Sequence, residues 1–144
     1  MTTLHCIYQN TIRVAVFTIM SLISTQAFAA GGFVCNFASG TVNTFENQVF
    51  QTAPAKSLSF EIGDIDLPRQ SASLVTKKGK GTLKIVRAIG ANHFLEVITE
   101  GYLNMTTIYD VKASDGSLPA VHSRHFGLLG TPVVSQYHGT CLPK

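Results

Sequence analysis

The feature that most constrains this chain is an alternation of apolar and polar residues with a period of two. Leu58, Phe60 and Ile62, for example, are separated by Ser59 and Glu61. This period is typical of a strand with one buried side, because successive side chains of a strand point to opposite faces. The pattern predicts eight or nine strands, in the segments 33–37, 42–50, 58–62, 72–77, 83–86, 95–98, 103–111, 120–128 and 133–141.

Residues that favour tight turns separate these segments at short, even intervals. Such spacing favours antiparallel hairpins, and no segment shows a sustained helical period, so little or no helix is expected. The predicted turns are Ser39-Gly40, Ala53-Pro54, Lys78-Gly79-Lys80-Gly81, Gly90-Ala91-Asn92, Glu100-Gly101, Asp115-Gly116 and Gly130-Thr131-Pro132.

The first 29 residues have the organisation of a bacterial secretory signal peptide. Arg13 precedes the mostly apolar run 14–23, and Ala27-Phe28-Ala29 supplies small residues at a cleavage site. Cleavage before Ala30 would leave residues 30–144 as a single secreted β domain. The apolar run is shorter than the roughly 20 residues that cross a bilayer, so no membrane span is predicted.

The expected compartment is a periplasm or the extracellular medium. Cys35 follows Gly32-Phe33-Val34, which does not fit the small residue that precedes a lipoprotein cysteine, so lipid attachment is not expected. With 45% hydrophobic and 13% charged residues the chain should fold. Its formal net charge of +3 is too small to indicate a nucleic acid partner.

Cysteine positions predict how the domain closes. Cys6 would leave with the signal peptide, so Cys35 and Cys141 remain in an oxidising compartment and are expected to form one disulfide. These residues lie in the first and last predicted strands. In an antiparallel up-and-down barrel of about eight strands those two strands are neighbours, which favours a small barrel. A β-sandwich is the alternative.

The last two predicted strands carry the most distinctive polar residues. If an even number of residues joins them, parity divides their side chains into one apolar and one polar face. The apolar face would hold Phe126, Leu128, Val133, Tyr137 and Cys141, and the polar face Ser123, His125, Gln136, His138 and Thr140. An odd number would mix the two sets and place His122 opposite His138.

The even register places His122 and Arg124 on the inward, apolar side. A buried guanidinium requires a partner. One hypothesis is an interior salt bridge from Arg124 to Glu96 or Asp110. The other is that Arg124, with His122 and Tyr137, contacts a small anionic or polar ligand at the barrel mouth.

Other candidate sites have weaker signals. His125 and His138 would lie directly or diagonally across from each other on the outer face, where two imidazoles can share Zn²⁺ or Cu²⁺. Ser123 has His138 as a possible base across the hairpin, but no acid is placed behind that histidine. Asp64 and Asp66 are expected to hydrogen-bond a turn rather than bind Ca²⁺.

Three function classes follow from these residues. The favoured one is a non-enzymatic periplasmic protein, expected to be a monomer without a cofactor, that binds a small or anionic ligand or inhibits another protein. The second is a structural or envelope-interaction protein without a small ligand. The third is a metal-dependent or hydrolytic enzyme that uses His125, His138 and Ser123.

Overall fold

A computed structural model describes the backbone of residues 31–99, 102–127 and 130–144, and their side chains except those of residues 97–99. The predicted signal peptide lies outside the described residues. Nine strands form one antiparallel sheet. They are β1 (Gly32–Glu46), β2 (Val49–Pro54), β3 (Leu58–Asp66), β4 (Ser71–Thr76), β5 (Gly79–Ala88), β6 (Ala91–Thr99), β7 (Tyr102–Tyr109), β8 (Leu118–Phe126) and β9 (Val133–Pro143).

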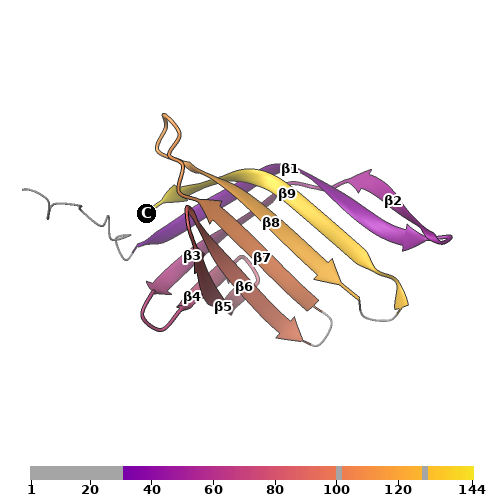
Figure 1. The fold of residues 1–144 in the computed structure, drawn as a ribbon, viewed down its shortest axis with the longest axis horizontal. Helices are drawn as coiled ribbons and strands as arrows, with labels where there is room; N and C mark the ends of the chain where they lie inside the picture. The colour runs from indigo at the N-terminus through magenta and orange to yellow at the C-terminus, as the bar shows by residue number, and fades with distance from the viewer. Residues whose placement is uncertain (1–30, 100–101, 128–129) are drawn as a thin grey trace, which may run out of the picture.

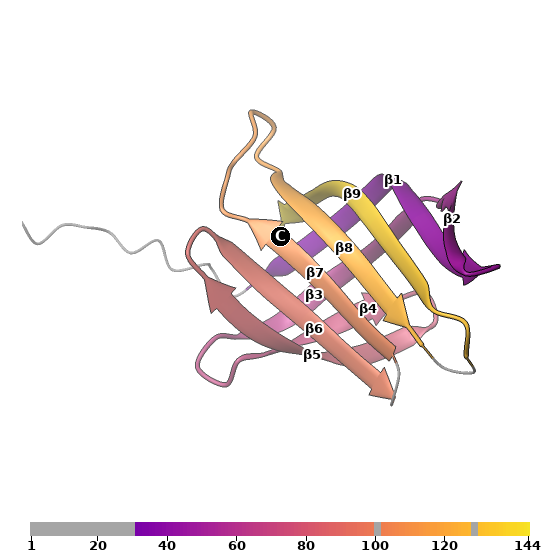
Figure 2. The same ribbon diagram turned by 45° about the vertical axis from the view of Figure 1, so that its right-hand side comes forward.

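Eight of these strands close into a barrel, because β1 pairs with β9 as well as with β3. The remaining strand, β2, pairs with the second half of β1 and extends with it beyond the barrel, as Figures 1 and 2 show. The all-β barrel is therefore confirmed, and the sandwich alternative is wrong. The described part of the chain contains no α-helix.

The disulfide lies at the seam that closes the barrel. Cys35 of β1 and Cys141 of β9 are directly opposite each other, bonded, and fully buried, with 4.0 Å between their Cα atoms. The prediction of this bridge is confirmed. It joins the first strand to the last, so it fixes the two strands whose pairing completes the barrel.

The barrel interior is filled by the inward side chains of the alternating pattern. Phe60 and Ile62 of β3 and Leu83 and Ile85 of β5 are buried, as their period of two predicts. Phe37 stacks on Phe60 with 5.5 Å between ring centroids. These residues belong to a core of Phe33, Cys35, Phe37, Phe60, Ile62, Ala72, Leu83, Ile85, Phe94, Ile108, Leu118, Ala120, Tyr137 and Cys141.

The prediction of the first turn is wrong. Ser39-Gly40 lies inside β1, where a bulge between Asn36 and Ser39 shifts the register against β9. The predicted strand 42–50 is instead interrupted by Asn47 and Gln48, which take positive φ angles of 51° and 65°. Two consecutive residues in that region form the tight hairpin turn between antiparallel strands. This turn creates the β1–β2 hairpin.

Candidate functional site

The register of the last hairpin places three predicted residues inside the barrel. Phe126 pairs with Val133, so residues 127–132 separate the strands, which is an even number. His122 is directly opposite Tyr137, and Arg124 lies two positions further along β8 on the same inward side. The preferred parity is therefore correct, and the alternative that paired His122 with His138 is wrong.

His122 is enclosed by aromatic rings. Its ring centroid lies 5.7 Å from that of Phe37, 5.1 Å from that of Phe60 and 5.9 Å from that of Tyr137. Burial, together with the nearby charge of Arg124, lowers the pKa of His122 from 6.5 to about 3. The imidazole is therefore neutral at any ordinary pH.

Hydrogen bonds fix the tautomer of that imidazole. Arg124 Nε donates to His122 Nε2 at 3.1 Å, and a guanidinium can only donate. The ring proton must therefore be on Nδ1, which donates to Thr106 Oγ1 at 2.9 Å. The hydrogen bonds from His122 to Thr106 and from Arg124 to His122 therefore orient the guanidinium through neutral groups.

The guanidinium of Arg124 has no carboxylate partner among the described residues. Its Cζ atom lies 5.5 Å from the ring centroid of Tyr137, and Nε bonds to His122. No hydrogen bond or ion pair within the described part of the chain uses its two Nη groups. These carry four of the five donors of an arginine.

The predicted salt bridge of Arg124 is therefore wrong. Glu96 instead accepts a hydrogen bond from Asn104 Nδ2 at 2.8 Å. Asp110 follows the far end of β7, where its backbone N–H donates to the carbonyl of Gly90. Glu96 is thus bonded to Asn104. Asp110 lies at the opposite end of β7 from Asn104, the residue that pairs with Arg124.

Arg124 lines a cavity of about 460 Å³ at one end of the barrel. This volume is within the usual range for small-molecule sites, roughly 300–1,000 Å³. Apolar side chains supply part of its wall, and charged or polar groups supply the rest. The lining residues are Ser57, Leu58, Ser59, Phe60, Leu74, Thr76, Lys77, Lys78, Glu96, Asn104, His122 and Arg124.

The cavity lies where the tip of the β4–β5 hairpin is not paired with either neighbouring strand. The last pair between β4 and β3 is Val75 with Glu61, whereas β3 continues towards Leu58 alongside β1. On the other side, β5 pairs with β6 only from Lys84 opposite Leu95. The outer part of the β4–β5 hairpin therefore pairs only with itself, and the cavity lies beside it.

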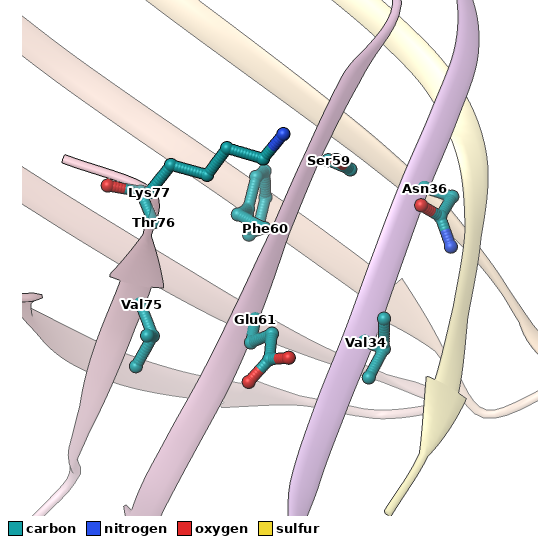
Figure 3. Close-up of a pocket in the computed structure, with 8 residues that line it drawn as sticks. All are labelled: Val34, Asn36, Ser59, Phe60, Glu61, Val75, Thr76 and Lys77. Atoms are coloured by element: carbon teal, nitrogen blue, oxygen red, sulfur yellow. The ribbon is translucent and has the colours of Figure 1, made fainter. Parts of the chain in front are cut away.

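A second hollow, of about 360 Å³, lies on the outer side of the same opening. Figure 3 shows Lys77 reaching from the end of β4 towards β3 above the Phe60 ring, with Val34, Glu61 and Val75 along the outer wall. The outer hollow and the cavity have four lining residues in common, Ser59, Phe60, Thr76 and Lys77. The two hollows therefore adjoin each other at residues 59–60 of β3 and 76–77 at the end of β4.

Asn104 was not identified as a site residue from the sequence. It is only 7% exposed, and its buried Oδ1 atom has no hydrogen-bond partner among the residues that the structure describes. Glu96, Asn104 and Arg124 form one row across β6, β7 and β8, since Asn104 pairs with both of the others. Inward parity shared with Arg124 was the signal that could have placed Asn104 in the site.

The geometric premise of the predicted metal pair is wrong. His125 is opposite Val134, and His138 is opposite Val121, so the two histidines are four positions apart along the hairpin. At about 3.3 Å per residue, this offset is too long for both rings to share one ion. Within the described ranges, no group of three or more His, Cys, Asp or Glu residues is placed to hold a metal.

The remaining candidates form ordinary local contacts. Ser123 is buried and pairs with Gln136, and the described residues include no hydrogen bond from Ser123 to a histidine. Asp66 accepts a hydrogen bond from the backbone N–H of Arg69, as expected for a turn residue. Asp64 is bound to Lys80 and Ser73, which lowers its pKa.

Comparison with known proteins gives no independent indication of function. No protein-family model matches the chain, and no curated protein is significantly similar to it. Among the residues that the structure describes, no helix has the length and apolar character needed to cross a membrane.

Proposed function

We propose that this protein binds a small anionic molecule in the cavity at the barrel mouth without catalysing a reaction. The observation that carries the proposal is Arg124, an inward-facing guanidinium that lines the cavity and has no carboxylate partner among the described residues. Arg124 is half-buried, and removing the rest of its charge from water as a ligand enters is costly unless the ligand supplies a charged partner. A ligand carboxylate or phosphate would supply that partner.

The surroundings of Arg124 support binding over catalysis. His122 is neutral and has both ring nitrogens occupied by Thr106 and Arg124, so it is not free to transfer a proton to a ligand. Lys77 and Lys78 line the same cavity and add positive charge near its entrance. Leu58 and Leu74 contribute apolar wall, which suits a ligand with an apolar body.

The test is calorimetric titration with 3-phenylpropionate and with its neutral amide. We expect the carboxylate to bind and Arg124→Met to weaken it by about 10- to 100-fold, as loss of a hydrogen bond to a charged group predicts. Arg87→Met is the matched control, because Arg87 is exposed on β5. Failure of every carboxylate probe to bind, or equal binding of 3-phenylpropionate by the wild-type and Arg124→Met proteins, would overturn the proposal.

The alternative of an interaction protein gains support if the cavity binds no anion. The β1–β2 hairpin exposes Phe45, Val49 and Phe50, and the two rings are 5.1 Å apart. Exposed apolar groups of this kind are frequent at protein contacts. The cavity titration therefore also decides between the two classes.

We further propose that the domain acts after export, with the chain cleaved before Ala30. The support is the sequence of residues 1–29 together with the closed disulfide, which suits an oxidising compartment. The intact mass of protein from an exported fraction tests this directly. A mature chain that begins at Ala30 is expected, whereas retention of Met1 in that fraction would contradict the proposal.

A further inference from the structure

The cavity presents two opposite charges, and neither is neutralised by the protein within the described residues. Within residues 31–99, 102–127 and 130–144, Arg124 has no acidic partner, and Glu96 bonds to the neutral amide of Asn104 and forms no ion pair. Both side chains line the cavity. A ligand with only a negative charge would satisfy Arg124 while bringing a second anion close to Glu96.

Asn104 lies between these two charges. Its Nδ2 group is used by Glu96, so the remaining atom of the amide, Oδ1, is fixed as the acceptor. That atom is buried and has no hydrogen-bond partner in the described part of the chain. A buried acceptor without a donor is destabilising, which makes it a group that a ligand donor would satisfy.

The spacing of the row matches a small molecule that carries both charges. Adjacent strands are about 4.8 Å apart, so the backbones of Glu96 and Arg124 are roughly 10 Å apart across β7. Both long side chains extend inward from there and narrow the gap. Gly81 leaves room for the acid, since a Cβ atom at this position would lie 2.9 Å from Glu96 Oε1.

We infer that the ligand is a zwitterion of the α-amino acid class with an apolar side chain. Its carboxylate binds Arg124, and its ammonium donates to Asn104 Oδ1 beside the Glu96 carboxylate. Leu58, Phe60 and Leu74 contact its side chain. This inference rests on the proposed function, because it assigns the chemistry of the ligand in the same cavity.

The test compares three probes of one shape by calorimetry on the oxidised protein. L-phenylalanine carries both charges, 3-phenylpropionate lacks the ammonium, and phenethylamine lacks the carboxylate. We expect L-phenylalanine to bind at least about 10-fold more tightly than either analogue, since each analogue leaves one charge of the cavity unpaired.

Variants identify the group that recognises the ammonium. Glu96→Gln keeps an acceptor for Asn104 and removes the charge. It should therefore weaken the binding of L-phenylalanine by about 10-fold and leave the binding of 3-phenylpropionate unchanged or tighter. Glu46→Gln is the control, because Glu46 is exposed on the β1–β2 hairpin. Equal weakening of both probes by Glu96→Gln would overturn the inference.

The two proposals fail in different ways. If 3-phenylpropionate binds through Arg124 and L-phenylalanine binds no more tightly, the assignment of a zwitterion is wrong and anion binding stands. If none of the three probes binds, both proposals are wrong. Tighter binding of phenethylamine than of L-phenylalanine would also contradict both, because the acid would then dominate recognition.

Discussion

At the scale of a residue, the buried His122 should make the stability of the protein depend on pH. Its pKa is about 3 in the folded chain and near 6.5 when unfolded. Between these pH values the unfolded chain binds a proton that the folded chain excludes. The free energy of unfolding should therefore fall as pH is lowered from about 6.5 towards 3, by up to about 1.4 kcal/mol per pH unit. Urea unfolding at several pH values measures this slope.

The control for this prediction is His122→Gln, which cannot titrate. Asp64 and Asp115 also have lowered pKa values, owing mainly to hydrogen bonds from Lys80 and Ser117 respectively. Both carboxyls add to the loss of stability in acid, and that loss is common to the wild-type protein and the His122→Gln variant. The variant should keep this common decline and lose the additional slope below pH 6.5. The same slope in both proteins would show that His122 is not the group responsible.

The inward position of His122 and Arg124 could be predicted because parity in the last hairpin depends only on an even loop. Asn104 could not be recognised as easily. In β7 the apolar Leu103 is exposed, whereas Asn104 and Thr106 are buried, so hydrophobicity alone suggests the opposite face. The unrecognised position of Asn104 also explains why the predicted salt bridge from Arg124 to Glu96 is wrong, since Asn104 donates a hydrogen bond to Glu96.

At the scale of an element, the β1–β9 seam depends on Gly139. A Cβ atom at this position would lie 2.0 Å from the carbonyl oxygen of Asn36 and 2.7 Å from Cα of Phe37, next to the bulge in β1. Because both neighbours are backbone atoms, they cannot move aside without breaking the pairing. We expect Gly139→Ala to reduce the free energy of unfolding by about 1–3 kcal/mol or more, measured by urea unfolding.

Gly63→Ala is the matched control within another strand. No atom of the described residues lies within 4 Å of a Cβ built at Gly63, so the added methyl should meet no obstacle. Its effect is expected to lie within about 1 kcal/mol, and it can be stabilising because the unfolded chain becomes less flexible. Comparable destabilisation by the two substitutions would mean that close approach at the seam is not the cause.

The same bulge explains why the turn predicted at Ser39-Gly40 is wrong. A glycine after a serine usually marks a reversal, but here it allows β9 to lie close to β1. A Cβ at Gly40 would lie 2.6 Å from the carbonyl oxygen of Gln136. Turn chemistry and close backbone approach both select glycine, and one sequence cannot separate them.

At the scale of the whole molecule, the barrel was predictable because the cysteines join the first strand to the last. The cavity was not predictable, because it depends on where pairing ends. β4 stops pairing with β3 at the Glu61–Val75 pair, and β5 joins β6 only at Lys84–Leu95. These limits follow from the relative stagger of four strands, which is a property of the closed barrel and not of any one segment.

Closure by the disulfide leads to a prediction about both stability and kinetics. The bridge spans a sequence separation of 106 residues, so its removal should lower the free energy of unfolding by up to about 4–5 kcal/mol. Cys35→Ser combined with Cys141→Ser should therefore unfold at a lower urea concentration. Because both cysteines are fully buried, dithiothreitol should reduce the native bridge only after the β1–β9 seam opens. Mass spectrometry after alkylation would then show a reduction rate that rises with urea and saturates with dithiothreitol. A rapid rate in native buffer, proportional to dithiothreitol, would contradict a seam that stays closed in the folded protein.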